Sequence, residues 1–527
     1  MVLYLIRGFV NGNIYVSFKP LRKAESMLVV GEKVAYVGEK GVVEAVVSRL
    51  GGELVDLGGR TVLPGFIDAH VHPDELGLYL STLDLRGTRS IKELKERLRK
   101  YAEAARTTWV LGHGWDQELF EEGRWPTRYD LDEVVAEKPV LLSRICLHAG
   151  VLNTKAVELA GLFNLKLPGV LRDEQGVPTG VVKEEAFELV RQKVEETLTI
   201  EDYAEFIERA LHYAASMGIT TVGFVSCGLK QLKAVFKLWS EKRLPVRVRV
   251  YLSYRDELVE AVKQLGIRRG FGDGYLKILG FKILADGSLG ARTAWLSEPY
   301  SDDPSTSGYP LLSEEELKRA VRKVDEAGLQ LAIHGIGDKA IDTVLRAYME
   351  LNKTREKRHR LEHASVLRDD QVELMAELGV VAVVQPHFVI SDWWVKNRLG
   401  EKRVHWVYRF KTLAEKGVEL AFSTDSPVEP LNPWETVYAA VTRGKYENVP
   451  YYEDTREECL STLDSLHYYT WGSAYALFEE DALGSLEEGK YADFVVVDRD
   501  PLVVSEEELK SIRVLETYVG GKKAWSL

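Results

Sequence analysis

The chain has 527 residues, 45% of them hydrophobic, with a net charge of −12 and a pI near 5.6. This length allows two to four domains with large cores, and the acidic charge without a lysine–arginine stripe argues against nucleic acid as a partner. No stretch has the roughly 18 uncharged apolar residues of a membrane helix, so we expect no membrane partner. Cys146, Cys227 and Cys459 lack CxxC spacing, which favours a reducing compartment without disulfides. Because the N-terminus also lacks the features of a secretion signal, we expect a cytoplasmic protein.

Both ends of the chain predict β-structure. Residues 1–62 contain short alternating stretches separated by Gly and Asn, which is the pattern of a small antiparallel sheet, and residues 485–527 repeat this pattern. Since chain termini often lie close together, we expect both ends to complete one composite β-sandwich.

Residues 63–484 alternate short apolar strands with amphipathic helices, which predicts an α/β fold with a parallel sheet. Eight candidate strands, the number of a (β/α)8 TIM barrel, lie at 65–72, 219–226, 246–254, 280–287, 329–337, 358–364, 380–387 and 418–427. Helices are expected over 313–328 and 369–379, which open with acidic residues and stop at Gly. The interval between the first two strands is too long for a loop, so residues from about 82 to 215 are expected to form an inserted subdomain.

Metal-ligating residue types stand at the ends of the predicted barrel strands. His70 and His72 alternate on one strand and therefore point the same way, while His334, His363 and Asp425 each end a later strand. A lone HxH pair could equally be two hydrogen-bonded structural histidines. Because barrel active sites lie at the carboxyl ends of the strands, the agreement of four strands favours a metal site.

Lys282 lies on the fourth candidate strand, where alternation points it into the barrel and Phe281 and Ile283 towards the helices. A buried ammonium needs a partner or a modification. Addition of carbon dioxide to the neutral amine would give a carbamate whose two oxygens could bridge two cations. The alternative is an ion pair between Lys282 and Asp286 or Glu184.

The phrases "PGFIDAHVH", "GHGWDQ", "FKILADGSLGARTA", "AIHGIGDKAID" and "STDSPVEPLNPW" resemble the amidohydrolase superfamily, and more closely its N-substituted formamide deformylase-like branch. The order HxH, Lys, His, His, Asp is similar to the binuclear signature of that superfamily. The resemblance implies one metal on His70, His72 and Asp425, and a second on His334 and His363, with carboxylated Lys282 bridging both. Imidazole and carboxylate ligands suit zinc best, and iron, manganese and cobalt stay open.

This resemblance implies a metal-dependent hydrolase that cleaves the C–N bond of a small amide-like molecule. A metal-activated hydroxide would attack the carbonyl, and Asp425 would carry its proton to the leaving nitrogen. The first alternative is a deaminase of a cyclic amidine or nucleobase, although mononuclear deaminases place Glu three residues after the strand-five histidine, where this chain has Asp338 at four. The second alternative is a non-catalytic metal-stabilised binding protein. A homodimer stays open as the assembly.

Further residues are expected around the substrate. The guanidinium of Arg292 could bind a substrate carboxylate in two-point fashion, or could pair with Asp286 to pin its own loop. The candidate pocket residues are His113, Trp115, His148, Asp286, Arg292 and His387.

Overall fold

The computed structural model describes residues 5–144, 148–167 and 169–527, so Cys146 and the first four residues of the expected sandwich lie outside the described residues. The chain forms two compact units. The first comprises the chain up to Pro73, Leu211–Gly228 and Lys242–Leu527, and the second comprises Asp74–Ala210 and Leu229–Glu241.

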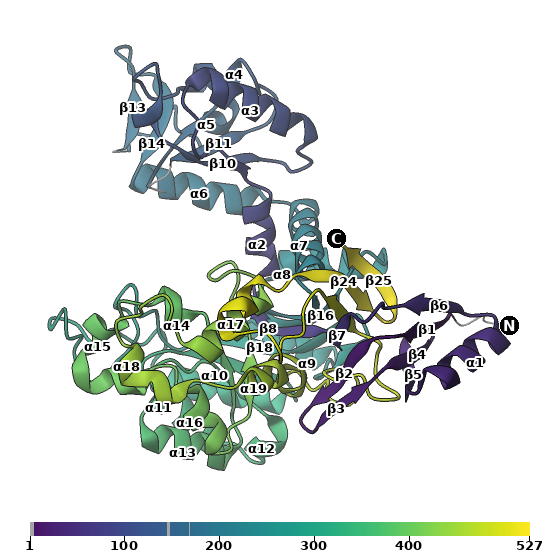
Figure 1. Cartoon of the computed structure of the whole chain (residues 1–527). Helices are drawn as coiled ribbons and strands as arrows, with labels where there is room; N and C mark the ends of the chain where they lie inside the picture. Colours follow the sequence, from purple (N-terminus) through teal and green to yellow (C-terminus); the bar gives the residue numbers. More distant parts are fainter. Residues whose placement is uncertain (1–4, 145–147, 168) are drawn as a thin grey trace. The chain divides into compact units, whose positions relative to one another are not determined.

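The first unit contains the barrel, whose eight strands are all parallel and follow the order β22-β21-β20-β19-β18-β16-β15-β8. Figure 1 labels three of them, β8, β16 and β18. The strands are β8 (Phe66–Val71), β15 (Ile219–Cys227), β16 (Arg247–Ser253), β18 (Leu276–Leu284), β19 (Gln330–Gly335), β20 (Arg360–His363), β21 (Val381–Val384) and β22 (Leu420–Phe422). Each predicted strand overlaps one of these, so the predicted barrel is confirmed.

The barrel closes where the first and last strands end. The backbone N–H of Asp425 donates to the carbonyl of His70 at 2.9 Å, and the N–H of His72 donates to the carbonyl of Ser426 at 2.9 Å. These bonds bring two predicted metal-ligating segments together through the backbone alone.

Helices follow the barrel strands along the chain, namely α9 (Asp256–Gln264), α10 (Glu314–Glu326), α11 (Asp338–Met349), α13 (Asp369–Leu378), α14 (Phe388–Ser391), α15 (Val395–Arg403), α16 (Phe410–Glu415), α17 (Pro433–Thr442) and α19 (Thr462–His467). The predicted helix start and stop signals explain where α10 begins and where α13 ends. Ser313 and Glu316 form a capping box at the start of α10, and Gly379 ends α13 in the left-handed region at φ 68°.

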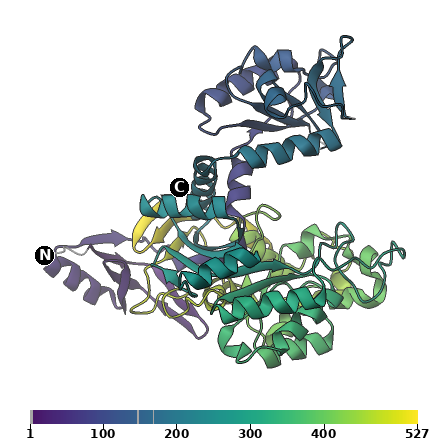
Figure 2. The same cartoon turned by 180° about the vertical axis from the view of Figure 1, so that it is seen from behind.

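Both ends of the chain form a β-sandwich, as predicted. One sheet has the order β25-β24-β23-β7-β2-β3 and the other β5-β4-β1-β6. Their bounds are β1 (Ile6–Val10), β2 (Asn13–Phe18), β3 (Leu21–Ala24), β4 (Ser26–Val30), β5 (Lys33–Gly38), β6 (Glu53–Asp56), β7 (Thr61–Pro64), β23 (Phe494–Val497), β24 (Val514–Val519) and β25 (Lys522–Ser526). Figure 2 shows the purple and yellow strands together. Between the sheets, the ring of Phe494 stacks on Tyr518 at 4.4 Å and meets Phe9 edge-on at 5.0 Å.

A buried ion pair joins this sandwich to the barrel: Arg247 on β16 pairs at 2.7 Å with Asp493, the residue before β23. Within the barrel, Glu479, which follows the last α-helix, accepts from Arg249 at 3.0 Å and from Lys277 at 2.6 Å. Removing one partner of a buried pair leaves an uncompensated charge, so loss of either Arg247 or Asp493 should be strongly destabilising.

The second unit is built on a separate sheet with the order β13-β14-β12-β11-β10-β9. Its elements are α2 (Pro73–Leu80), β9 (Leu83–Asp84), α3 (Ile91–Ala104), β10 (Val110–Trp115), α4 (Arg128–Asp132), β11 (Val140–Arg144), β12 (Ala149–Leu152), α5 (Thr154–Leu159), β13 (Val170–Arg172), β14 (Pro178–Lys183), α6 (Glu185–Thr197) and α8 (Leu229–Ser240). Helix α7 (Ile200–Ser216) begins in this unit and ends in the first. The unit thus begins before residue 82 and also includes Leu229–Glu241.

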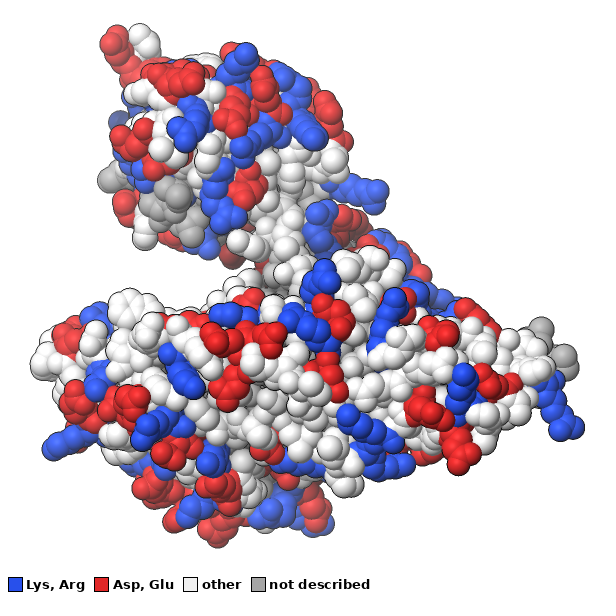
Figure 3. All heavy atoms as spheres, viewed as in Figure 1, with Lys and Arg blue, Asp and Glu red and all other residues white. Residues whose placement is uncertain are grey.

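Of the helices in the described part of the chain, none combines the length and apolar character needed to cross a membrane. On the face drawn in Figure 3, basic and acidic side chains are interspersed on both units. Cys227 and Cys459 are free thiols.

Candidate metal centre

Three buried side chains form the centre of the site. One ligand atom each from His70, His363 and Asp425 lies within 4.8 Å of the other two. An Asp425 carboxylate oxygen is 3.2 Å from His70 Nε2 and 3.1 Å from His72 Nε2, and the other is 4.0 Å from His363 Nδ1. Four side chains from three strand ends therefore surround one small volume.

The two remaining predicted ligands adjoin this group. Lys282 is buried, with Nζ 3.5 Å from His70 Nε2. The ring of His334 lies 4.5 Å from that of His363, centroid to centroid, and its Nε2 is 2.9 Å from the Gly287 carbonyl. The six residues thus form one continuous cluster at the carboxyl ends of the barrel strands.

Unusual backbone conformations place two of the ligands. His363 has φ 72° and Asp425 has φ 57°, in the left-handed region that non-glycine residues seldom adopt. Such conformations cost about 1–3 kcal/mol each and persist where the surrounding structure imposes them. Strict alternation would send Glu362 and His363 to opposite faces of β20. Both nevertheless adjoin His70, because the turn at His363 redirects its side chain.

A buried carboxylate behind the centre orients His70. Glu362 Oε2 accepts from His70 Nδ1 at 2.5 Å, and Arg360 donates two hydrogen bonds of 2.7 Å to Glu362. Burial opposes ionisation, but the Arg360 guanidinium and the His70 bond hold the pKa of Glu362 far below its ordinary value. This contact fixes the tautomer that leaves His70 Nε2 available as a ligand. The paired charges of "RLEH", two residues apart on a buried strand, were a signal for it.

Gln385 supports His363 in the same way. Its Oε1 accepts from His363 Nδ1 at 2.8 Å, and its Nε2 donates to Ser423 Oγ at 2.8 Å. His363 Nε2 is thereby the ring nitrogen left for a metal. A buried glutamine at the end of β21 was the only hint in the sequence.

We expect Gln385→Met to weaken metal binding about 10–100-fold, because the His363 ring loses the contact that orients it. The apo-protein should lose only about 1–3 kcal/mol of stability, since the Ser423 hydroxyl keeps its bond to the Val384 carbonyl. Competition with a chelating dye measures the affinity. The matched control is Gln371→Met, a buried glutamine on α13 that bonds to Asp338 and Asp342. Equal metal affinity in the Gln385 variant and wild type would refute the orienting role.

Asp68 ties β8 to the end of β22. It accepts from the Thr424 hydroxyl at 2.7 Å and from Tyr469 at 3.2 Å, and burial raises the pKa of Asp68 to about 7. Its bonds hold the strands that carry His70 and Asp425 in register.

Burial also sets the protonation state of the predicted ligands. It lowers the pKa of Lys282 to about 8 and lowers the pKa values of His70 and His363, the latter helped by the neighbouring His334. Although burial alone would raise it, the contacts with His70 and His72 hold the pKa of Asp425 well below its ordinary value. Neutral imidazoles beside an ionised carboxylate are the state in which these groups bind a divalent metal, so the donor set fits such an ion.

Two pairings that the sequence leaves open as alternatives do not form. Asp286 accepts from three backbone amides at 2.8–3.1 Å and lies 3.4 Å from His334, so it serves the backbone rather than Lys282 or Arg292. These amides belong to Trp295, Ile336 and Gly337. Arg292 instead pairs with Asp302 at 3.1 Å. A carboxylate accepts hydrogen bonds from the nearest donors that point towards it. The sequence does not reveal which loop supplies those donors.

The predicted pocket residues of the inserted unit have different surroundings. Trp115 is fully buried in that unit's core and donates to the Leu142 carbonyl at 2.8 Å, as expected of a residue whose polar group is satisfied inside the unit. His148 is exposed, with Nδ1 3.8 Å from Glu184, whose side chain is 78% exposed; this excludes Glu184 as a buried counter-ion. His113 is half-buried, stacks on Tyr79 at 5.7 Å and lines a hollow of about 150 Å³.

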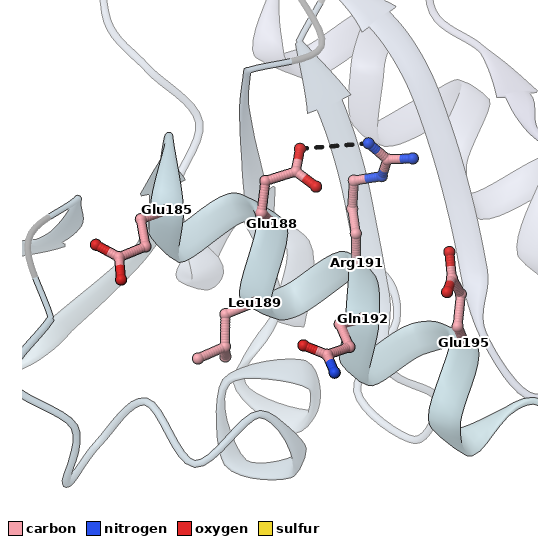
Figure 4. Close-up of a pocket in the computed structure, with 6 residues that line it drawn as sticks. All are labelled: Glu185, Glu188, Leu189, Arg191, Gln192 and Glu195. Atoms are coloured by element: carbon pink, nitrogen blue, oxygen red, sulfur yellow. Dashed lines mark hydrogen bonds and ion pairs between the residues drawn. The ribbon is translucent and has the colours of Figure 1, made fainter. Parts of the chain in front are cut away.

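A second hollow of the inserted unit, of about 440 Å³, follows the surface of α6 (Figure 4). Its lining residues are Glu185, Glu188, Leu189, Arg191, Gln192 and Glu195. Glu188 and Arg191 pair at 3.3 Å with more than half of each side chain exposed, which is typical of a solvated helix face.

His387, the last predicted pocket residue, follows β21. Its Nδ1 hydrogen-bonds to Glu429, and its Nε2 is 3.7 Å from Glu435. Glu429 is buried and also accepts from Ser391. His387 is therefore held between two carboxylates.

Comparisons with known proteins agree with this geometry. The family model described as "Amidohydrolase family" matches residues 53–524. The Bacillus subtilis protein YtcJ is 34% identical over 89% of this chain and 90% of its own length, and N-substituted formamide deformylase of Arthrobacter pascens is 28% identical over 97% of both chains. A crystal structure of an uncharacterized metal-dependent hydrolase from Pyrococcus furiosus is 43% identical, with a TM-score of 0.82, covering 94% of this chain and 100% of the other.

Proposed function

Since the chain belongs to the amidohydrolase family, we propose that it is a hydrolase that cleaves the C–N bond of a small amide-like molecule with the help of divalent metal ions. The observation that carries the proposal is the buried group of His70, His363 and Asp425, whose ligand atoms lie within 4.8 Å of one another. Hydrolysis of an amide needs an activated water, a polarised carbonyl and a proton carrier, and this cluster can supply all three.

We assign the ligands as follows. His70, His72 and Asp425 would hold one ion, His334 and His363 the second, and carboxylated Lys282 both. Zinc is the ion that imidazole and carboxylate ligands suit best in an open catalytic site. When bound, such ions lower the pKa of water from about 15.7 towards about 7 and polarise a carbonyl oxygen.

Side chains of the protein would transfer the proton and orient the metal ligands. Asp425, ionised and in contact with His70 and His72, accepts the proton of the attacking water and delivers it to the leaving nitrogen. Glu362 and Gln385 keep the imidazoles of His70 and His363 in the ligating tautomer.

Burial prepares Lys282 for modification. Burial lowers the pKa of Lys282 from 10.5 to about 8, so the neutral amine is far more abundant near neutral pH than for an exposed lysine. Only the neutral amine attacks carbon dioxide. The low pKa thus supports a carbamate at this position.

Two observations favour amide hydrolysis over deamination. The relative named N-substituted formamide deformylase acts, by that name, on N-substituted formamides. Asp338, the residue nearest in sequence to the deaminase glutamate, accepts from the backbone N–H of Ser297 at 3.0 Å and pairs with Arg368 at 2.9 Å. It is therefore engaged at the start of α11 rather than poised beside His334.

We expect chelation to lower the rate of amide hydrolysis about 100-fold or more, and added zinc to restore it, because the water and carbonyl lose their activating ions. The assay uses a panel of N-acyl amines, formamides and cyclic amides, with metal content measured on the same samples. Hydrolysis that is insensitive to removal of all metal would contradict the proposal. Stoichiometric metal binding without turnover on any amide would favour the non-catalytic alternative.

A further inference from the structure

An exposed leucine, Leu284, is the last residue of β18, the fourth barrel strand. Leu284 is 46% exposed and lies two residues beyond the buried Lys282 on β18. The register with β19 is unbroken from Gly280 to Leu284, and it pairs Leu284 with His334. Since strand side chains alternate, Leu284 lies on the same face as Lys282 and beside His334, towards the mouth of the barrel.

Two further apolar side chains follow other strands of the site. The half-buried ring of Phe388, at the start of α14, lies 6.3 Å from that of His363, centroid to centroid. Val428 is 63% exposed, and its backbone N–H donates to the Asp425 carbonyl at 2.9 Å. Leu284 thus adjoins His334 and the ring of Phe388 adjoins His363, while Val428 lies in the turn that follows Asp425. Exposed apolar groups around a reacting centre are typical of a substrate site.

The basic side chains that follow these strands already have acidic partners. Arg292, after β18, pairs with Asp302, and His387, after β21, lies between Glu429 and Glu435. A substrate carboxylate would therefore compete with Asp302 for Arg292, and at His387 it would lie close to two carboxylates. The electrostatics favour an uncharged group here.

We propose that Leu284, Phe388 and Val428 form an apolar subsite for an uncharged hydrocarbon group of the substrate, which makes the substrate a neutral amide rather than an N-acyl amino acid. This inference rests on the proposed amide hydrolysis. It also replaces the expectation that Arg292 binds a substrate carboxylate.

The test compares two amides with the same acyl group, reacting bond and chain length: an N-pentyl amide and the corresponding amide of 5-aminopentanoate. The acyl group is the one that the panel above identifies. For the metal-loaded wild-type protein we expect kcat/KM to be at least about 10-fold higher for the pentyl compound. Leu284→Lys and Val428→Lys should each shift the ratio about 10-fold towards the anionic compound. Leu265→Lys, at a 74% exposed leucine after α9, should leave both rates unchanged.

Equal or higher kcat/KM for the anionic compound in the wild type would overturn the subsite. So would lysine variants that leave the ratio unchanged. Both outcomes would leave amide hydrolysis itself intact. Failure of the metal-loaded protein to cleave any amide of the panel would instead refute the proposed function.

Discussion

Replacement of Asp425 by Asn is expected to lower kcat about 1000-fold or more, because the amide cannot carry the proton of the attacking water and is a poorer ligand. The fold should survive. Asn tolerates the left-handed φ of 57° about as well as Asp, and the backbone bond from residue 425 to the His70 carbonyl does not involve the side chain. Steady-state kinetics at saturating metal, with circular dichroism and thermal unfolding on the same samples, measure both effects.

The matched control for this substitution is Asp369→Asn at the start of α13. Its side chain is 82% exposed and pairs with Arg409, so the rate should equal that of the wild type. An Asp425 variant that retains a near wild-type rate would remove Asp425 from the mechanism.

Replacement of Lys282 by Ala is expected to lower kcat at least about 100-fold, and added acetate or propionate should restore part of the activity. The buried side chain leaves space next to His70, and a small carboxylate placed there offers the same two oxygens as the lysine carbamate. Activity and metal content are measured against the concentration of the added acid.

The control on the same strand is Lys277→Ala. Lys277 contacts Glu479 at 2.6 Å, and Arg249 remains as a partner for that carboxylate, so the variant should show no response to added acids. Loss of activity in the Lys282 variant without rescue, and with unchanged metal content, would refute the bridging role.

The sequence predicts the barrel and the neighbourhood of the six candidate ligands because both depend on local rules. Alternation directs His70 and His72 to one face, and the carboxyl ends of parallel strands meet at one rim whatever the intervening helices contain. His334 follows the same rules. These features need no knowledge of which distant residue contacts which.

What lies behind the ligands could not be predicted in this way. Glu362 contacts His70 from 292 positions away, and such a contact depends on the closed barrel rather than on either segment. Trp115 shows a second limit, because a motif of aromatic and polar residues in an insert can equally belong to the core of that insert, where Trp115 is buried. The partners of Asp286 could not be predicted, because backbone amides, which nearly every residue carries, compete with the charged side chains that a sequence displays.

The pairing of β7 with β23 affects how this protein folds during its synthesis on the ribosome. Pro64 on β7 lies opposite Phe494 on β23, about 430 residues later in the chain. At a synthesis rate of about 5–20 residues per second, β23 is therefore made about 20–90 s after β7. During that time one edge of β7 is an open template for another nascent chain. Fragments that stop before residue 494 should therefore aggregate during synthesis, even when their barrel strands are complete, and translation speed should influence the yield of native enzyme.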